Sequence, residues 1–567
     1  MPRRRTWSRL TDLAVFAAVL VLFYALLELG RTLLGPVTPA AEISRSPRAL
    51  PSYAVFSLAR IVISYVLSLG VALLYGYVTA RSARAERILL PLLDILQSIP
   101  VLSFLPGVML AMVALFPGRQ LGIELGSILL IFTGQAWNMA FSLYGSLKAI
   151  PRELDEAARL YRFSRWQRLK ELELPYAAIG LVWNSMMSVA GAWFFLMTCE
   201  MFELGQRDFR LPGLGSYLQL AASAGDTAAI LWGLAAMIGV IVALDQLVWR
   251  PVIVWAERFK FEEVEGATPP RSAVLELLRR SGLFAAFYRR LTKPASERLT
   301  LAFARRARAA AQVAKPRAGL RWLGAALGLV LVVGLGYAAV RACVVLARLN
   351  VQDLRELARG TGITFLRVEA ALLLGALWTI PAGVAIGSSP RLARLAQPLV
   401  QIAASVPATA LFPVVLLVLI RWGGGMGLAS LVLMLLGTQW YILFNVIAGA
   451  MAIPSDLKEA AAVFRFGSWD RWRRLILPGI FPYLVTGMLT ASGGAWNASI
   501  IAEYFHFKGQ TLSTAGLGAT ISRATDGGQM HLLLAATIVM ASVVVMINRL
   551  VWQRLYRLAE TRFKLET

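Results

Sequence analysis

The sequence predicts an all-α polytopic membrane protein built from two tandem halves of six membrane spans each. Three observations predict this fold class. The 567-residue chain is 58% apolar, and its mean hydropathy of +0.64 is far above that of a soluble domain. The apolar residues form long runs separated by short basic segments. A polar segment around Glu156 returns around Glu459, 303 residues later, and indicates an internal duplication.

The first half contains six apolar runs, each long enough to cross about 30 Å of hydrocarbon as a helix. The chain starts with a basic stretch that resembles a signal peptide in outline, but the first run is long for a signal sequence, so we expect an uncleaved span. The predicted spans are Leu13–Leu29, Tyr53–Thr79, Ile88–Phe116, Leu121–Leu147, Tyr176–Glu200 and Ile230–Trp255.

The second half contains a matching set of six runs, which brings the predicted total to twelve spans. These spans are Leu320–Val340, Phe365–Gly387, Leu395–Ile420, Leu428–Ala450, Gly479–Glu503 and His531–Leu555.

The spans divide the chain into two membrane domains, residues 1–257 and 319–567. Between them, residues 258–318 form a basic linker that carries Pro269-Pro270. We expect the linker to be cytoplasmic and partly helical. A solvated tether attracted to anionic lipid headgroups is a stronger interpretation of its charge than a regulatory role.

Basic residues orient the predicted spans. With a cytoplasmic N-terminus, the inside loops carry Arg81, Arg84 and Arg87, then the polar segment around Glu156, then Arg391 and Arg394, and then the polar segment around Glu459, which agrees with the positive-inside rule. Because each half has an even number of spans, the halves are parallel and both chain termini are cytoplasmic. Both repeated polar segments therefore face the cytoplasm.

The third span of each half is interrupted by proline. Pro91, Pro100 and Pro106 return 307 residues later as Pro398, Pro407 and Pro413. Proline removes a backbone donor and kinks a helix, and freed backbone at membrane depth is tolerated where it is buried in protein or lines a cavity. We therefore expect these kinks to face a pathway, in preference to a purely packing role.

The repeated polar segment predicts a short amphipathic helix in each half. Leu154, Ala158 and Tyr161 are spaced to share one helix face. Such a helix outside the bilayer can rest on the lipid surface, cap its own bundle, or dock into a partner. From the residues alone, these interpretations remain open.

A family resemblance favours docking. Residues 151–175 and 454–478 each contain Glu-Ala-Ala and end in Leu-Glu-Leu-Pro or Leu-Ile-Leu-Pro, which resembles the cytoplasmic coupling loop of type I ABC importer permeases. The resemblance implies two permease domains and two ABC ATPase subunits seated on the loops. It assigns ATPase coupling to Glu156, Ala157, Ala158, Arg162, Phe163, Trp166 and Arg168, and to Glu459, Ala460, Ala461, Arg465, Phe466, Trp469 and Arg471.

One position departs from the family pattern. The place usually held by glycine is occupied by Arg162 in the first loop and by Arg465 in the second. A guanidinium at this place could pair with carboxylates on the partner.

Two further motifs resemble one branch of this family. Trp193 and Trp496 each follow an alanine and precede a glutamate by seven residues, and a Gly-Leu-Gly motif comes next. The resemblance is to the permeases for nitrate, sulfonate, taurine and bicarbonate, among which duplicated permeases are known. It implies a bacterial cytoplasmic (inner) membrane protein that moves a small anion by alternating access, supplied by an extracytoplasmic substrate-binding protein.

Few polar residues lie in the predicted spans, and these are the candidates for a pathway. Arg60 and Arg367 could attract an anion or be structural, and the amides and hydroxyls could bind solute or bond between helices. For Glu200 and Glu503 we favour gating or contact with a binding protein. The candidates are Arg60, Gln97, Ser98, Pro100, Asn184, Trp193, Glu200, Arg367, Ser405, Pro407, Trp496, Asn497 and Glu503.

Composition excludes several other functions. The net charge of +25 lies in short loops beside apolar runs, so it indicates membrane orientation and not nucleic-acid binding. Cys199 and Cys343 offer no disulfide framework or metal pair, and His506 and His531 cannot build a metal site by themselves. The sequence has no phosphate-binding loop and no catalytic constellation, so this chain is not an enzyme and we expect ATP and Mg²⁺ on the partner ATPase.

Two alternatives remain open from the sequence. An autonomous secondary transporter with six plus six spans would need ion-coupling acids deep in the membrane, for which only Asp94 and Glu369 are plausible. An ABC permease for a solute that is not an anion would share all the motifs above. A membrane scaffold fits poorly with proline kinks repeated in both halves.

Overall fold

The computed structural model describes residues 43–117, 119–204, 207–259, 343–507 and 510–562, with a few isolated residues between 272 and 341. The predicted spans Leu13–Leu29 and Leu320–Val340 and the linker 258–318 lie almost entirely outside the described residues.

The described part of the first half is a helical bundle whose helices coincide with the remaining predicted spans. Long apolar segments with few breakers form these helices, because a helix satisfies every backbone group within itself. They are α2 (Leu50–Arg81), α3 (Ala83–Ser98), α4 (Leu105–Leu115), α5 (Gln120–Lys148), α8 (Leu174–Glu200), α10 (Thr227–Leu244) and α11 (Arg250–Ala256).

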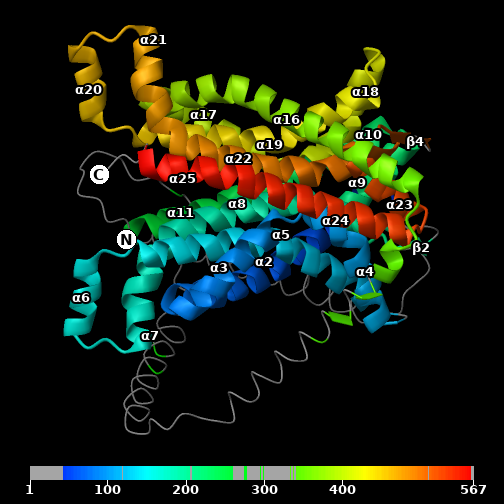
Figure 1. Ribbon diagram of the computed structural model, residues 1–567, viewed down its shortest axis with the longest axis horizontal. Helices are drawn as coiled ribbons and strands as arrows, with labels where there is room; N and C mark the ends of the chain where they lie inside the picture. Colours follow the sequence, from blue (N-terminus) through cyan, green and yellow to red (C-terminus); the bar gives the residue numbers. More distant parts are fainter. Residues whose placement is uncertain are drawn as a thin grey trace, which may run out of the picture.

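The second half repeats this arrangement and lies beside the first (Figure 1). Its helices are α16 (Val351–Ser388), α17 (Pro390–Ser405), α18 (Ala408–Arg421), α19 (Met426–Ala452), α22 (Leu477–Ala502), α24 (Met530–Ile547) and α25 (Gln553–Arg562).

Seven helices of the described chain are long and apolar enough to cross a membrane. The helix α5 is long but is not among them, since it carries polar residues such as Glu124 and Gln135, both of which are buried inside the protein. The seven are Pro47–Arg81, Arg165–Glu200, Thr227–Phe259, Val351–Ser388, Met426–Ala452, Ser468–Ala502 and Met530–Ala559.

The predicted break in the third span is confirmed in both halves. The helix α3 ends at Ser98, Pro100 is extended, and a 3-10 turn (η2, Val101–Phe104) leads into α4. In the second half α17 ends at Ser405 and α18 begins at Ala408. Each span is therefore two short helices joined by irregular backbone.

Four π-helical segments also occur at matching places in the two halves. Two of them precede the fifth predicted span of each half, and two lie in the last part of the sixth; each widens the helix by about one residue per turn. The segments are η3 (Leu169–Glu173), η4 (Asp245–Trp249), η7 (Trp472–Ile476) and η8 (Asn548–Trp552).

The two ends of the molecule differ. At one end, on the left of Figure 1, two helical hairpins project from the bundles: α6 (Arg152–Leu160) with α7 (Arg165–Arg168), and α20 (Ser455–Val463) with α21 (Ser468–Arg471). The opposite end holds α9 (Leu214–Ala224), α23 (Leu517–Asp526) and the β hairpins β1 (Glu203–Leu204) with β2 (Arg207–Asp208) and β3 (Tyr504–Phe507) with β4 (Gln510–Ser513). The repeated polar segments thus share one end, as parallel halves require.

Candidate functional site

The first repeated segment forms a helix that ends in a left-handed turn. At the end of α6 the amide of Phe163 donates to the carbonyl of Ala158 at 3.0 Å, and that of Arg162 donates to the carbonyl of Arg159 at 2.9 Å. This pair of bonds is the Schellman motif, which needs a residue with positive φ after the helix. Arg162 supplies it with φ of 52°.

The second segment ends in the same way. The amide of Phe466 donates to the carbonyl of Ala461 at 2.9 Å, and Arg465 has φ of 51°. These two arginines are the only residues other than glycine with positive φ in the described chain. The left-handed turn therefore forms with arginine at the position where glycine is usual, at a conformational cost of about 1 kcal/mol per site.

An apolar tip is exposed beside each left-handed turn. Leu160 and Tyr161 are 82% and 78% exposed in the first half, and Val463 and Phe464 are 77% and 75% exposed in the second. Glu156, Glu459, Arg162 and Arg465 are exposed too, whereas Ala158 and Ala461 are buried against their own bundle. Large apolar side chains exposed outside the bilayer indicate a protein-binding surface.

The two segments differ in how they are held. In the first half the carboxylate of Glu173 is fully buried and forms ion pairs with Arg81 at the end of α2 and with Arg168, whose Nε lies 3.0 Å away. Arg168 also pairs with Asp155 on α6. This chain of charges, the α6 clamp, joins the projecting helix to two membrane helices.

The second half has no equivalent of the α6 clamp. Ser388, Lys458 and Ile476 stand in the places of Arg81, Asp155 and Glu173. Arg471, the counterpart of Arg168, is exposed and makes no ion pair with any described residue. In the described residues, the second segment is joined to its bundle by weaker contacts such as that from Lys458 on α20 to the carbonyl of Ala450 on α19, at 3.5 Å.

At the opposite end, a buried ionic network joins α2, α5, α8 and α9. Arg60 donates two hydrogen bonds to Glu124, at 2.6 and 2.7 Å, and one to Glu200 at 2.7 Å. The hydroxyl of Ser57 donates to the same oxygen of Glu200 at 2.7 Å. Arg60 is fully buried and its charge is balanced within the first half.

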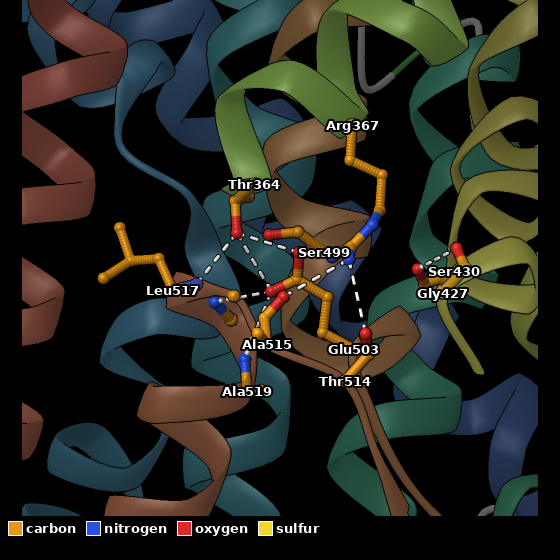
Figure 2. A network of polar contacts seen from close by, with 12 residues as sticks. Thr364, Arg367, Gly427, Ser430, Ser499, Glu503, Thr514, Ala515, Leu517 and Ala519 are labelled. Atoms are coloured by element: carbon orange, nitrogen blue, oxygen red, sulfur yellow. Dashed lines mark hydrogen bonds and ion pairs between the residues drawn. The ribbon is translucent and has the colours of Figure 1, made fainter. Parts of the chain in front are cut away.

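Figure 2 shows the matching network of the second half. Arg367 pairs with Glu503, and Thr364 donates to both oxygens of this carboxylate, at 2.8 and 3.0 Å. The counterpart of Glu124 is Gly427, so Arg367 has one carboxylate where Arg60 has two. The Arg367 side chain keeps 12% of its surface exposed.

Both glutamates sit against the start of a helix. Glu200 accepts the amide of Gly215 at 2.7 Å at the start of α9, and Glu503 accepts that of Gly518 at 2.9 Å at the start of α23. A Cβ atom added at Gly213 or Gly516 would overlap the carboxylate. The Gly-Leu-Gly motif thus leaves room for a carboxylate at a helix N-terminus, where negative charge is favoured.

These contacts bear on the pathway candidates. Arg60, Glu200, Arg367 and Glu503 are engaged in networks inside their own halves, which is the structural role that the sequence left open for the arginines. Trp193 and Trp496 are buried in the core. Asn184 donates to Gly180 on its own helix.

Gln97 bonds within its own half, whereas Asn497 contacts the other half. Gln97 is exposed and donates to Asn138 at 3.3 Å. Asn497 accepts the amide of Leu102 from the other half at 3.4 Å. Pro100 is buried at the break in the third span. The side chains of Ser98 and Ser405 lie outside the described residues.

Further polar contacts cross between the halves, among them one from Gln401 to the sulfur of Met186 at 3.1 Å. Gln401 on α17 donates to Asp245 in η4 at 2.9 Å, and Thr537 on α24 donates to the carbonyl of Ser103 at 3.0 Å. Asp245, Gln401 and Glu124 are not among the residues predicted from the sequence. A lone acid inside an apolar run was the available signal for Glu124 and Asp245.

A cavity of about 130 Å³ lies at this interface. One wall comes from α8 of the first half, and the others come from α17, α19 and α22 of the second. Of the predicted pathway residues, the cavity contacts Asn497 and Pro407. The broken third span of the second half therefore does line a cavity.

The end of the interface opposite to the helical hairpins carries a polar cluster on the β3–β4 hairpin. Tyr504 donates to Asp526 at 2.7 Å, and Nε2 of His506 lies 3.1 Å from the same oxygen. Burial, followed by the hydrogen bond and charge of Asp526, raises the pKa of Tyr504 to about 12. Tyr504 is therefore a neutral donor at physiological pH.

Comparison with known families agrees with the duplicated architecture. The model for the binding-protein-dependent transport system inner membrane component matches residues 68–248 and again residues 379–564, which is more than half of the chain. The chain belongs to this family. The two matched regions fall within the predicted domains 1–257 and 319–567, whose boundaries stay predictions.

Individual similar proteins align with about a quarter to a third of the chain. The chain is 27% identical over 185 residues to a nitrate import permease of Leptolyngbya laminosa, covering 33% of this chain and 63% of that protein. It is 29% identical over 137 residues to a bicarbonate transport system permease of Synechocystis sp., covering 24% and 48%. A Bacillus subtilis protein provisionally named as an aliphatic sulfonates transport permease is 27% identical over 181 residues, covering 32% and 62%.

The chain thus spans less than two thirds of the length of each of these relatives. It is an ABC permease of the inner-membrane-component family with two copies of the membrane domain. The residue roles in the two coupling segments remain predictions.

Proposed function

We propose that this chain is the transmembrane permease subunit of an ATP-driven, binding-protein-dependent importer, and that its two halves form the translocation pathway between them. The observation that carries the proposal is the pair of exposed helical hairpins at one end of the molecule. Each hairpin combines an apolar tip, a Glu-Ala-Ala sequence and a left-handed turn. Two ABC ATPase subunits would grip the two hairpins, and ATP and Mg²⁺ would bind to those subunits.

The arrangement of the halves supports an alternating-access mechanism. ATP binding would bring the two ATPase subunits together, and the hairpins would move with them. The halves meet through few polar contacts and enclose a cavity between them, so they can rock as units and expose the cavity to either side. Solute would arrive from an extracytoplasmic substrate-binding protein.

The relatives bear on the solute and the location. Proteins similar to this chain are named for import of nitrate, transport of bicarbonate and transport of aliphatic sulfonates. We infer a small anion of the nitrate, sulfonate, sulfate or bicarbonate class. The basic loops favour a bacterial cytoplasmic membrane with both termini in the cytoplasm.

Copurification tests the partnership. The full chain would be purified in nanodiscs with the ATPase encoded beside it, as the natural sequence and with Glu156→Ala and Glu459→Ala together. We expect the natural chain to retain the ATPase and the double variant to lose most of it. A double variant with Glu153→Ala and Lys458→Ala is the control, since these residues are neighbours on the same helices.

ATP hydrolysis is the second readout. A binding protein loaded with one anion would stimulate hydrolysis, while the unloaded protein would not. Uptake driven by an ion gradient without any bound ATPase would instead support a secondary transporter, and would move attention to Asp245, the acid that meets the other half.

A further inference from the structure

The cavity between the halves has an apolar wall. Met186, Met187, Phe194 and Phe195 face it from α8, and Trp440 and Tyr441 face it from α19. None of the residues that the structure shows lining this cavity carries a charge. A small inorganic anion would lose its hydration here without a compensating cation.

The amides of the cavity are already engaged. Gln401 donates to Asp245 at 2.9 Å and to the sulfur of Met186 at 3.1 Å. Asn497 donates to the carbonyl of Gly493 at 3.1 Å and accepts the amide of Leu102. These side chains hold the interface together, so they are poor replacements for the water around an anion.

The place related to this cavity by the duplication, on the other side of the interface, has a different set of residues. In the first half the counterparts of Gln401, Tyr441 and Ala404 are Asp94, Asn138 and Gln97. The space beside Gly134 there is filled by the ring of Phe195, which a Cβ atom at Gly134 would overlap. By contrast, a Cβ atom at Gly191 or Gly437 would meet only an ordinary contact at 3.6 Å, so the cavity has room for one more carbon atom at each place.

We infer that this cavity receives an organic solute with an alkyl or aryl body and one small polar head, and not an inorganic anion such as nitrate or bicarbonate. Methionine and aromatic side chains gain by covering an apolar body and adapt to its shape. This inference rests on the proposed transport function and narrows its substrate class.

Direct binding to the full chain in nanodiscs, without ATPase, tests the inference. The probes are nitrate, methanesulfonate, butanesulfonate and hexanesulfonate, with empty nanodiscs to subtract partition into lipid. We expect affinity to rise about threefold to fourfold per methylene and nitrate to bind at least tenfold more weakly than hexanesulfonate. Hexanol binding as tightly as hexanesulfonate would also support recognition of the apolar body.

Filling the cavity supplies the matched variants. Gly191→Leu places a side chain in the cavity and should weaken hexanesulfonate binding at least tenfold. Gly239→Leu is the control, because Gly239 on α10 is exposed and has no atom near its Cβ position. Equal affinity for nitrate and hexanesulfonate, no binding of any probe, or binding unchanged by Gly191→Leu would overturn the inference. Because no ATPase is present, these outcomes are independent of the copurification result.

Discussion

Arg162 and Arg465 hold a conformation that glycine adopts more easily. Both have positive φ, and both lie next to exposed apolar tips. Strained backbone conserved between two copies of one motif is a reason to look for a function of the side chain. A guanidinium at the end of the docking helix is suited to carboxylates on the ATPase.

Replacing these arginines with glycine should therefore separate stability from partner binding. We expect Arg162→Gly and Arg465→Gly each to stabilise the chain by up to about 1 kcal/mol, because glycine removes the left-handed strain. The same variants should bind the ATPase several-fold more weakly. Thermal unfolding and titration with the ATPase measure the two effects.

Arg165→Gly is the matched control for stability, since Arg165 lies in the helix α7. Glycine there should destabilise by about 1 kcal/mol. If Arg162→Gly lowered the unfolding temperature as Arg165→Gly does, the left-handed turn would not be the source of strain.

The glycine before α23 supports a second prediction about a single residue. Gly516→Ala would push the Cβ atom into the carboxylate of Glu503 and break its bonds to Arg367 and to the start of α23. We expect a loss of about 2 to 4 kcal/mol in the free energy of unfolding, since a buried charge loses its partners. Gly493→Ala has open space and should change stability little in the same thermal unfolding measurement. If Gly516→Ala and Gly493→Ala lowered the free energy of unfolding equally, the close contact between residue 516 and the Glu503 carboxylate would not be the cause.

Sequence reasoning located these residues but not their partners. The Trp and Gly-Leu-Gly motifs marked Glu200 and Glu503 because both motifs recur at one offset. The network that Arg60 forms with Glu124 depends on packing between residues 64 positions apart, which no local pattern encodes. Local patterns also do not decide whether Arg60 and Arg367 attract an anion or have a structural role.

At the scale of elements, spans and breaks were predictable because hydrophobic length and proline positions are local properties. The helices α3 and α4, for example, meet at the predicted proline break. The π-helical segments and the α6 clamp were not predicted. The place of a π-helical turn depends on how side chains pack around it. The clamp joins residues that are far apart in the sequence, on α2, α6 and η3.

The α6 clamp predicts that the two projecting helices differ in rigidity. Glu173→Gln removes the buried charge that holds Arg81 and Arg168 together, so we expect faster amide hydrogen exchange across Arg152–Leu160. The helix Ser455–Val463 lacks a clamp and should exchange faster than Arg152–Leu160 in the natural chain.

The control is Ile476→Gln at the matching place in the second half. It changes no ion pair, so exchange in the first hairpin should stay as it is. Equal exchange of the two hairpins in the natural chain would show that the clamp adds no rigidity. Because the clamp links α6 to α2 and α8, Glu173→Gln should also reduce the solute moved per ATP more than Ile476→Gln does.

At the scale of the whole molecule, the halves are joined by few polar contacts in the described chain, and the bond between Gln401 and Asp245 is one of them. The hydrogen bond from Gln401 to Asp245 should stabilise the conformation in which the two halves are in contact at these residues. A double-mutant cycle of Asp245→Ala and Gln401→Ala isolates this contact. We expect a coupling energy of about 0.5 to 1.5 kcal/mol in thermal unfolding of the full chain.

A parallel cycle of Asp245→Ala with Asn184→Ala should be additive, since Asn184 donates within its own helix. If the first cycle were additive as well, the contact would not hold the halves together, and the apolar packing around the cavity would have to carry their association.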